Sequence, residues 1–192
     1  KMKKIKVKLN NEEVEFNPNK TILENCKKYR IKIPTLCYHK TLGTEARCRV
    51  CLVELNGKLV TACSTKITEN SILLTNSERV LKARKRNLEL MNVDVNMDKL
   101  SDDFEAREIY NEVGLDNERF KSIKDYKPDL GAAIMRDNNK CINCGRCVSV
   151  CSKIQEIYAI DFASRAHNEH VTPYNEKHLA EVACIRCGQC LI

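Results

Sequence analysis

The sequence contains no tryptophan, and aromatic residues make up only 5% of its 192 residues. Glycine and proline are also scarce, with six and four copies respectively. Because large aromatic side chains supply much of the apolar surface that cores bury, their shortage predicts a modest core. The hydrophobic content of 43% nevertheless favours a globular chain of one or two domains over a disordered one.

The sequence also lacks any apolar run of the about 18 to 20 residues that a membrane-spanning helix needs. It begins with Lys1-Met2-Lys3-Lys4-Ile5 and continues into polar residues, so no apolar leader is visible. We therefore expect no direct membrane insertion and a cytoplasmic location. In that reducing setting, cysteines bind metals more often than they form disulfides.

Cysteine is abundant, with twelve copies, and the first set comprises Cys37, Cys48, Cys51 and Cys63. A close pair with one single cysteine on each side suits a 2Fe-2S cluster, in which each iron takes two thiolates. Zinc also accepts four cysteines, but zinc sites usually draw them as two close pairs. The spacing therefore favours a 2Fe-2S cluster, with structural zinc as the alternative.

The second set lies in two runs, CINCGRCVSVC with Cys141, Cys144, Cys147 and Cys151, and CIRCGQC with Cys184, Cys187 and Cys190. Three cysteines spaced by three surround one corner of a 4Fe-4S cubane, and the fourth cysteine of such a run ligates the neighbouring cluster. We therefore group Cys151 with Cys184, Cys187 and Cys190. The cubane of Cys141, Cys144 and Cys147 then needs a fourth ligand, which we expect beyond Ile192 in a longer natural chain. The alternative is that this site is incomplete, labile or holds a three-iron cluster.

Small residues and apolar residues surround these runs. Gly145 and Gly188 are expected to permit close approach of the backbone to the sulfides, with N–H groups donating to sulfur. Four apolar residues are expected to form a dry shell around the cubanes: Ile142, Val148, Ile185 and Leu191.

The apolar pattern predicts a mixed helix and strand fold. Alternation and turn residues predict strands at 5–9, 14–16, 50–55, 58–62 and 72–75, with Asn56-Gly57 joining two of them as a hairpin. Helical signals predict a helix from the N-cap Thr21, with Glu24, to near Tyr29. Cys26 lies inside this helix and is predicted to be a buried apolar thiol rather than a ligand.

Two further helices are predicted, at 77–91 and at 102–113. The second is expected to bury Ala106, Ile109, Tyr110 and Val113 on one face and to stop at Gly114. The polar segment 116–131, which contains Pro128, reads as a connector.

Taken together, these motifs resemble a known family. They are IPTLCYH, CRVCLVEL with Cys63, RKRNLELM, KCINCGRCVSVC, AIDF and LAEVACIRCGQC. The chain is similar to the iron–sulfur portion shared by the large peripheral subunit of complex I, the small diaphorase subunit of NAD-reducing hydrogenases and the N-terminal region of iron-only hydrogenases.

The resemblance implies an α+β fold in three parts. These are a β-grasp 2Fe-2S ferredoxin-like domain at 1–76, a helical connector at 77–131, and a bacterial ferredoxin-like domain with two 4Fe-4S clusters at 132–192. One departure stands out, because relatives commonly carry a His and three Cys after the RKRNLELM-like helix. The corresponding stretch, MNVDVNMDKLSDDFEAREIY, has neither. We therefore expect that additional cluster to be absent and read Asp94, Asp98, Asp102 and Asp103 as surface or capping residues.

The implied function is a one-electron relay between a flavin- and NAD(P)-binding subunit and another redox subunit or ferredoxin, in a hetero-oligomer. No GxGxxG motif and no acid–base or nucleophilic constellation is visible, so we assign no catalytic residue. One alternative is the N-terminal relay region of an iron-only hydrogenase. An alternative of another class is a zinc-stabilised nucleic-acid-binding module.

The formal net charge of +7 is the main argument for nucleic acid. A cluster held by four thiolates carries a charge of about −2, so three clusters bring the loaded protein to roughly +1. We therefore expect no nucleic-acid partner. A basic stretch of the second helix is read as a solvated face, comprising Arg79, Lys82, Arg84, Lys85 and Arg86.

The remaining histidines and aromatics receive structural interpretations. His39, beside Cys37, is expected to tune the 2Fe-2S cluster rather than ligate it, because Rieske-type sites need two histidines. His167, His170 and His178 are expected at the surface, and Tyr158 and Phe162 in the core.

Overall fold

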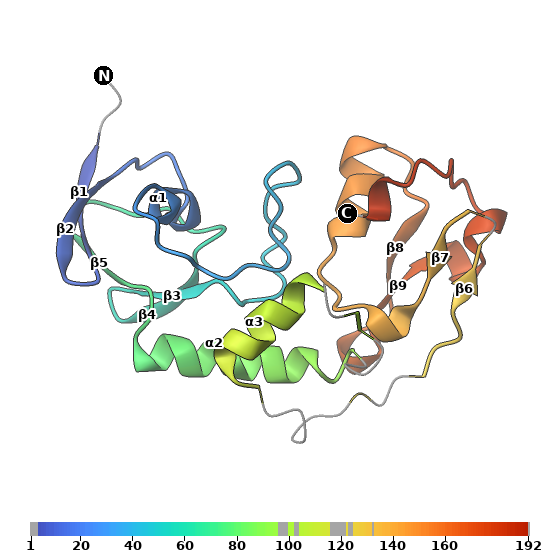
Figure 1. The fold of residues 1–192 in the computed structure, drawn as a ribbon. Coiled ribbons are helices and arrows are strands. Elements are labelled where there is room, and N and C mark those ends of the chain that lie inside the picture. The colour runs from blue at the N-terminus through green and yellow to red at the C-terminus, as the bar shows by residue number, and fades with distance from the viewer. Residues whose placement is uncertain are drawn as a thin grey trace. The chain divides into compact units, whose positions relative to one another are not determined.

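The computed structural model describes residues 4–95, 100–101, 104–115, 122, 125–131 and 133–191. The chain forms two compact units (Figure 1). The first comprises residues 1–36, 48–88 and 105–115, and the second comprises residues 37–47, 89–104 and 116–192. Each unit is described by itself below.

The first unit is built on a five-stranded sheet in the order β2-β1-β5-β3-β4. Its strands are β1 (Ile5–Leu9), β2 (Glu12–Phe16), β3 (Leu52–Leu55), β4 (Lys58–Thr61) and β5 (Ser71–Leu74). β1 runs parallel to β5, and the other pairs are antiparallel. Ile5, Val7 and Leu9 are buried while the intervening lysines are exposed, as the alternation in the sequence predicts.

Asparagines make the tight turns of this sheet. Asn56 and Gly57 join β3 to β4 with φ angles of 48° and 77°, the left-handed conformation that a two-residue hairpin turn requires. Asn10 and Asn11 join β1 to β2 in the same region, at 48° and 76°. Both predicted strand connections are therefore confirmed.

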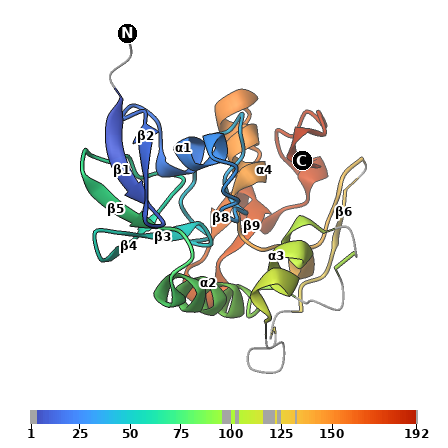
Figure 2. The same ribbon diagram turned by 60° about the vertical axis from the view of Figure 1, so that its left-hand side comes forward.

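One helix lies beside the sheet, α1 (Ile22–Lys28) (Figure 2). Thr21 caps its first turn: the Thr21 hydroxyl accepts from the Glu24 amide, and the Glu24 carboxylate accepts from the Thr21 amide, as predicted. Cys26 is fully buried, and burial raises the pKa of its thiol to about 12. The prediction of a buried apolar thiol is confirmed.

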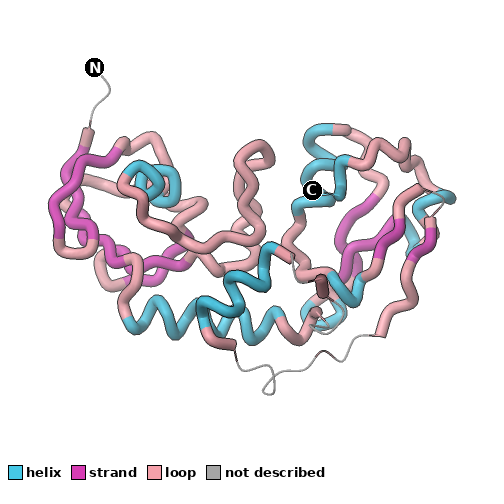
Figure 3. The backbone as a smooth tube through the Cα atoms, viewed as in Figure 1, coloured by secondary structure: helices cyan, strands magenta, loops and turns pink. Residues whose placement is uncertain are grey.

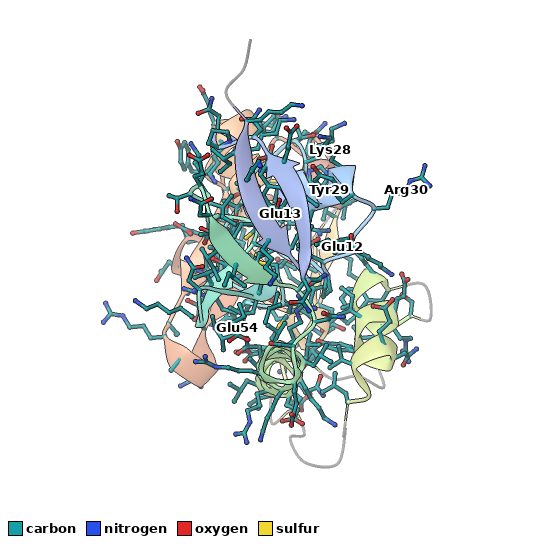
Figure 4. All side chains as sticks on the ribbon, turned by 90° about the vertical axis from the view of Figure 1, so that its left-hand side faces the viewer. Glu12, Glu13, Lys28, Tyr29, Arg30 and Glu54 are labelled. Carbon is teal, nitrogen blue, oxygen red and sulfur yellow. The ribbon has the colours of Figure 1, made fainter. Side chains whose placement is uncertain are left out.

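The end of α1 packs against the edge strand β2. Figure 4 labels Glu12 and Glu13 on this strand and Lys28 and Tyr29 at the end of the helix. The Tyr29 hydroxyl donates to the Glu15 carbonyl at 2.5 Å and accepts from the Glu15 amide at 3.1 Å. These two bonds occupy backbone groups that an edge strand otherwise leaves unpaired.

Two further helices are α2 (Glu78–Met91) and α3 (Glu105–Val113). Within the first unit, α2 buries Val80, Arg84 and Leu88, which share one face at intervals of four residues. α3 buries Ala106, Ile109 and Tyr110, while Val113 is half-buried. Gly114, at φ 65°, ends α3 as predicted, whereas the predicted start at Asp102 lies outside the described residues.

The second unit contains short elements joined by long loops (Figure 3). Its strands form two antiparallel pairs, β6 (Asp129–Leu130) with β7 (Met135–Arg136), and β8 (Ile160–Ala163) with β9 (His170–Pro173). The helix α4 (Arg146–Ser149) continues as a π-helical turn, η3 (Val150–Ile154). The 3₁₀ turns are η2 (Asn138–Lys140), η4 (Ala166–Asn168), η5 (Tyr174–Glu176), η6 (Leu179–Glu181) and η7 (Gln189–Leu191).

The apolar cluster of the second unit is small. Among the described residues, it comprises the buried Ile134, Ile160, Val171 and Leu179. Eight partly buried side chains pack against these four, and five of the eight are cysteines. Two sequence predictions are wrong here. Tyr158, predicted as core, is 70% exposed, and Leu191 of the predicted dry shell is 69% exposed. Ile185 of the same predicted shell is 57% exposed, although it lines the pocket of the last cysteines. Few bulky side chains are available to cover them in a unit with so little sheet.

In the part of the chain that the structure describes, none of the helices combines the length and the apolar character required to cross a bilayer.

Candidate metal centres

Three cysteines gather in the first unit at one end of the β3–β4 hairpin. Cys51 directly precedes β3, and Cys63 follows β4 by two residues. Because Leu52 pairs with Thr61, the two cysteines leave the hairpin at the same end. Cys48, Cys51 and Cys63 are all buried, at 8%, 2% and 2% exposure.

The thiols of this group interact with one another. The pKa of the Cys51 thiol is raised strongly, first by its hydrogen bond with Cys63, then by burial, and in smaller part by the negative charge of Cys48. Thiolates crowded in this way repel each other in the absence of a cation. The arrangement therefore suits a positively charged iron core, which favours deprotonated thiols.

A buried arginine holds the backbone beside Cys51. The Arg84 guanidinium donates to the Leu52 carbonyl, from Nε at 2.9 Å and Nη2 at 2.7 Å, and to the Thr75 carbonyl at 3.0 Å. Burial lowers the pKa of Arg84 to about 10, while the nearby Cys51 opposes that shift. The predicted solvated face is thus wrong for Arg84, which is 5% exposed, although Arg79, Lys82 and Arg86 are exposed.

The fourth predicted ligand of this group, Cys37, is buried and lies in the segment Cys37–Arg47 of the second unit. Its membership of the group rests on the sequence spacing. His39, two residues on, is half-buried, and its Nδ1 accepts from the Thr41 amide at 3.3 Å. The Nδ1 atom of His39 is therefore already used by a hydrogen bond within the same turn.

In the second unit, one pocket gathers the four cysteines that the sequence groups together, Cys151, Cys184, Cys187 and Cys190. Cys151 comes from the π-helical turn η3 and the other three from the C-terminal loop. The pKa of Cys190 is raised by burial first, and then by the negative charges of Cys184, Cys187 and Cys151. Apolar side chains complete its wall: Ile134, Val150, Ile157, Ile160, Leu179 and Ile185.

The other triplet, Cys141, Cys144 and Cys147, lies on the loop that leads into α4. Burial raises the pKa of Cys147 to about 12, with smaller contributions from the charges of Cys141 and Cys144. Burial also raises the pKa of Cys144, to which the charge of Cys37 adds. The thiols of Cys141 and Cys144 therefore lie close enough to Cys147 to influence its ionisation.

Backbone N–H groups donate to the sulfurs of this triplet. The Asn143 amide donates to Cys141 Sγ at 3.4 Å, and the amides of Arg146 and Val148 donate to Cys144 and Cys147. Such bonds stabilise thiolates and are typical of iron–sulfur sites. Gly145, with φ 82°, allows the turn that aims these amides; a Cβ there would also lie 3.3 Å from Arg47 Cδ.

Sequence reasoning missed one more cation near cysteines, the half-buried Arg136. Burial lowers the pKa of its guanidinium, while Asp129, Cys141 and Cys147 raise it. Arg136 belongs to no recognised motif, and Arg84, although it opens the RKRNLELM motif, is predicted from the sequence to face solvent. The interval of four residues between Val80, Arg84 and Leu88 was nevertheless a signal that Arg84 faces the core.

The histidines of the second unit have structural partners. His178 is exposed as predicted, and its Nδ1 lies 2.9 Å from Asp129 Oδ1. His170 is half-buried on β9 rather than at the surface, and its ring packs against Tyr126 at 5.2 Å. The side chain of His167 lies outside the described residues.

Among described residues, no three His, Cys, Asp or Glu side chains are close enough to share one metal ion.

Two family models match the chain. Residues 2–78 match the 2Fe-2S iron-sulfur cluster binding domain, and residues 131–183 match the ferredoxin-like domain of NADH-quinone oxidoreductase subunit 3. The chain is therefore an iron–sulfur protein with a 2Fe-2S domain followed by a ferredoxin-like domain. The predicted resemblance to the iron–sulfur portion of complex I and NAD(P)-linked hydrogenases is supported by these matches, and the predicted α+β fold is confirmed.

Individual relatives agree with this classification. The chain is 36% identical over 184 residues to an NADP-reducing hydrogenase subunit, HndD, of Solidesulfovibrio fructosivorans, covering 89% of this chain and 32% of that protein. It is 30% identical over 193 residues to a candidate formate dehydrogenase of Staphylococcus aureus, covering 96% of this chain and 19% of that protein. The chain thus spans a third or less of the length of these curated relatives.

A solved structure shows the same fold. The crystal structure of a NAD⁺-reducing [NiFe]-hydrogenase in the H2-reduced state matches with a TM-score of 0.80 and 24% sequence identity, covering 94% of this chain and 80% of that chain.

Proposed function

We propose that the chain relays single electrons between a flavin- and NAD(P)-binding partner and another redox subunit or ferredoxin, as part of a hetero-oligomeric oxidoreductase. The proposed cofactors are one 2Fe-2S cluster at Cys37, Cys48, Cys51 and Cys63, one 4Fe-4S cluster at Cys151, Cys184, Cys187 and Cys190, and one at Cys141, Cys144 and Cys147. The proposal assigns no catalytic residue. Domain limits of 1–76, 77–131 and 132–192 are part of it, and the matched ranges 2–78 and 131–183 support them.

The observation that carries the proposal is the pocket that gathers Cys151 with Cys184, Cys187 and Cys190. Cys151 and Cys184 are 33 positions apart in the sequence, yet both line the same pocket. Exchange of the fourth cysteine between two triplets is the signature of two-cluster ferredoxins. The chain's own groups supply the thiolates, the N–H donors and a wall that limits water.

When bound, such clusters accept and donate one electron at a time at potentials set by burial, net charge and hydrogen bonds to sulfur. The residues described above control each of these quantities. The apolar wall limits water, and the amides of Asn143, Arg146 and Val148 donate to sulfur. The guanidinium groups of the buried Arg84 and the half-buried Arg136 place positive charge beside cysteines.

A reductive titration of anaerobically reconstituted protein, followed by electron paramagnetic resonance, tests the proposal. We expect about ten irons per chain and separate signals from one 2Fe-2S and two 4Fe-4S clusters. Iron and acid-labile sulfide are counted on the same sample. A colourless protein that holds stoichiometric zinc and lacks labile sulfide would reject the relay and favour the zinc-stabilised module.

A second candidate is the relay region of a larger catalytic chain, such as an iron-only hydrogenase. It is favoured because the chain spans only 32% of its hydrogenase relative and 19% of its formate dehydrogenase relative. The intact gene product discriminates: further cysteine motifs for a catalytic cluster favour this candidate, and a stop shortly after the second triplet favours the separate subunit.

A further inference from the structure

The segment Cys37–Arg47 has an unexpected set of contacts. It lies within residues 2–78, which match the 2Fe-2S domain, and between two of the proposed 2Fe-2S ligands, Cys37 and Cys48. Its side chains nevertheless contact residues 143–169, which lie within the matched ferredoxin-like domain. Accordingly, the segment belongs to the second compact unit.

Arg47 makes the most extensive of these contacts. Its guanidinium forms an ion pair with Glu169, donates from Nε to the Asn143 carbonyl at 3.3 Å, and stacks with its central carbon 3.8 Å from the centroid of the Phe162 ring. The Arg47 side chain is 32% exposed. Planar stacking combined with directed N–H bonds is a role that arginine fills and lysine does not.

Gly145 makes room for this contact. A Cβ at this position would lie 3.3 Å from Arg47 Cδ and 3.4 Å from Phe162 Cζ, closer than ordinary van der Waals contact in the first case. The turn of the first cubane triplet is thus shaped to accept the Arg47 side chain.

Glu45 forms a second anchor, two residues before Arg47. One carboxylate oxygen accepts from Lys153 Nζ and from the Ser149 hydroxyl, each at 2.5 Å. Burial alone would raise the pKa of Glu45, but these two hydrogen bonds lower it, so the carboxylate stays ionised. Ser149 lies in α4 and Lys153 in η3, next to two of the proposed cubane ligands.

A third anchor lies beside Cys37 itself, where Arg146 Nη2 donates to the Tyr38 carbonyl at 3.1 Å. Between the anchors the segment closes on itself: His39 and Gly43 exchange backbone hydrogen bonds of 3.1 and 2.8 Å. A segment fixed at both ends and paired in the middle loses little further entropy when its first residue binds a ligand.

We propose that Cys37–Arg47 is a strap, held by the ferredoxin-like domain, that positions the Cys37 thiol for the 2Fe-2S cluster, so that retention of this cluster depends on Glu169, Phe162 and Lys153. The proposal rests on the proposed function, because it requires Cys37 to be a 2Fe-2S ligand. Arg47 and Glu45 act as positioning residues, since they touch neither iron nor sulfide.

The test compares Arg47→Ala with Arg49→Ala in the reconstituted holoprotein. Both changes remove one arginine next to Cys48, but the exposed Arg49 side chain makes none of the strap contacts among described residues. Each variant is treated anaerobically with an iron chelator, and the loss of 2Fe-2S and 4Fe-4S signals is followed by electron paramagnetic resonance. We expect Arg47→Ala to lose the 2Fe-2S signal about tenfold faster than the wild type, with the cubane rates unchanged.

Charge exchange provides the rescue. Glu45→Lys breaks the bond to Lys153 and speeds loss of the 2Fe-2S signal, and adding Lys153→Glu restores much of the original rate because the pair re-forms with reversed charges. Equal rates in Arg47→Ala, Arg49→Ala and the wild type would overturn the strap. Equal acceleration of all cluster signals would also overturn it, because it would assign Arg47 to the folding of the ferredoxin-like domain alone.

A Cys37→Ser variant separates this proposal from the one on which it rests. Loss or alteration of the 2Fe-2S spectrum in Cys37→Ser, together with wild-type behaviour of Arg47→Ala, keeps the cluster assignment and rejects the strap. An unchanged 2Fe-2S spectrum in Cys37→Ser rejects both.

Discussion

The two units bury their cysteines differently. In the first unit, Cys48, Cys51 and Cys63 are at most 8% exposed, and Cys51 and Cys63 flank the β3–β4 hairpin of a five-stranded sheet. In the second, the cysteines of both triplets are half-buried, except Cys187, which is exposed. The first unit surrounds its site with a core of its own, whereas the second arranges short elements around the site.

The two units also differ in their buried apolar side chains, and this difference bears on how each unit folds. The first unit buries side chains contributed by β1, β2, α1, β3, β5 and α2, including Phe16, Leu23, Val53, Leu73 and Leu88. The apolar cluster of the second unit has four buried members and is completed by its cysteines. Small domains with too little apolar burial depend on metal–ligand bonds for stability. The clusters are therefore expected to be structural in the second unit and to be added to an existing fold in the first.

Removal of the clusters is the strongest test of this contrast. After anaerobic chelation under reducing conditions, we expect the second unit to unfold while the sheet of the first unit persists. Amide hydrogen exchange reports on both: Val7 and Leu73 should stay protected, and Ile160 and Val171 should exchange at rates near those of an unfolded chain. Simultaneous loss of protection in both units would show that the first unit also needs its cluster.

Two serine substitutions compare a cysteine proposed as a ligand with one that is not. Cys151→Ser is expected to abolish or convert the cubane of Cys184, Cys187 and Cys190 while leaving the cubane of Cys141 largely intact, because Cys151 lines the same pocket as the former three cysteines. Cys26→Ser, which changes a fully buried thiol with a pKa of about 12, should leave every cluster signal in place and cost about 1–3 kcal/mol of unfolding free energy. Electron paramagnetic resonance and thermal unfolding measure the two effects, and greater damage to the cubane of Cys141 would overturn the ligand grouping.

The same contrast explains how far the sequence could predict the structure. Thr21 with Glu24 and Asn56 with Gly57 are local signals that need no distant partner, so the first unit was predicted with strand limits within about two residues. The second unit has few such signals. The pairing of β8 with β9 was not predicted, since HVTP reads as a polar loop until Ile160 and Val171 meet in the same cluster.

The predictions for the exposure of two single residues, Tyr158 and Arg84, were wrong because each rested on the usual behaviour of its residue type. Tyr158 was expected in the core because tyrosine usually is at least half-buried, but it adopts φ 55° and points outward from a turn after η3. Arg84 was expected in solvent because arginine usually is. Its three bonds to the carbonyls of Leu52 and Thr75 come from elements that the sequence alone does not bring together.

Arg84 offers a third, intermediate test. In Arg84→Met, the loss of a buried positive charge near Cys51 should make the reduced, more negative 2Fe-2S centre less favourable. We expect its midpoint potential to fall by about 30–60 mV, since 59 mV corresponds to a tenfold change for a one-electron couple. The loss of donors to the Leu52 and Thr75 carbonyls should also cost about 1–3 kcal/mol of stability.

The control is Arg86→Met, an exposed arginine two residues along α2. It removes the same formal charge outside the core, where solvent screens it, so the 2Fe-2S potential should move by much less. Equal shifts in the two variants would indicate a general charge effect rather than the buried guanidinium. Redox titration with the 2Fe-2S signal as the readout measures both.

The smallest expected effect concerns the pH dependence of the second unit. The pKa of His178 is raised by its hydrogen bond to Asp129, then by the charge of Asp129 and, least, by that of Glu181. The pKa of Asp129 is lowered: burial works the other way, but the bonds from His178 and the Leu179 amide outweigh it. A raised histidine pKa stabilises the fold below its ordinary value near 6.5, and this stabilisation is lost as the pH rises through the raised pKa.

A lowered carboxyl pKa acts in the opposite direction, because its stabilisation is present above the ordinary value of 3.8 and is lost as the pH falls through the lowered pKa. The pair should therefore stabilise the second unit most between these limits, and only slightly, since the His178 side chain is 69% exposed. In a nuclear magnetic resonance titration, Asp129→Asn should return the pKa of His178 toward 6.5, and Glu181→Gln should shift it less, in the order of their contributions. If Glu181→Gln had the larger effect, the bond to Asp129 would not be the cause of the raised pKa. As a second measurement, the thermal midpoint of the wild-type holoprotein should decline between pH 6.5 and the raised pKa, and it should decline less in Asp129→Asn.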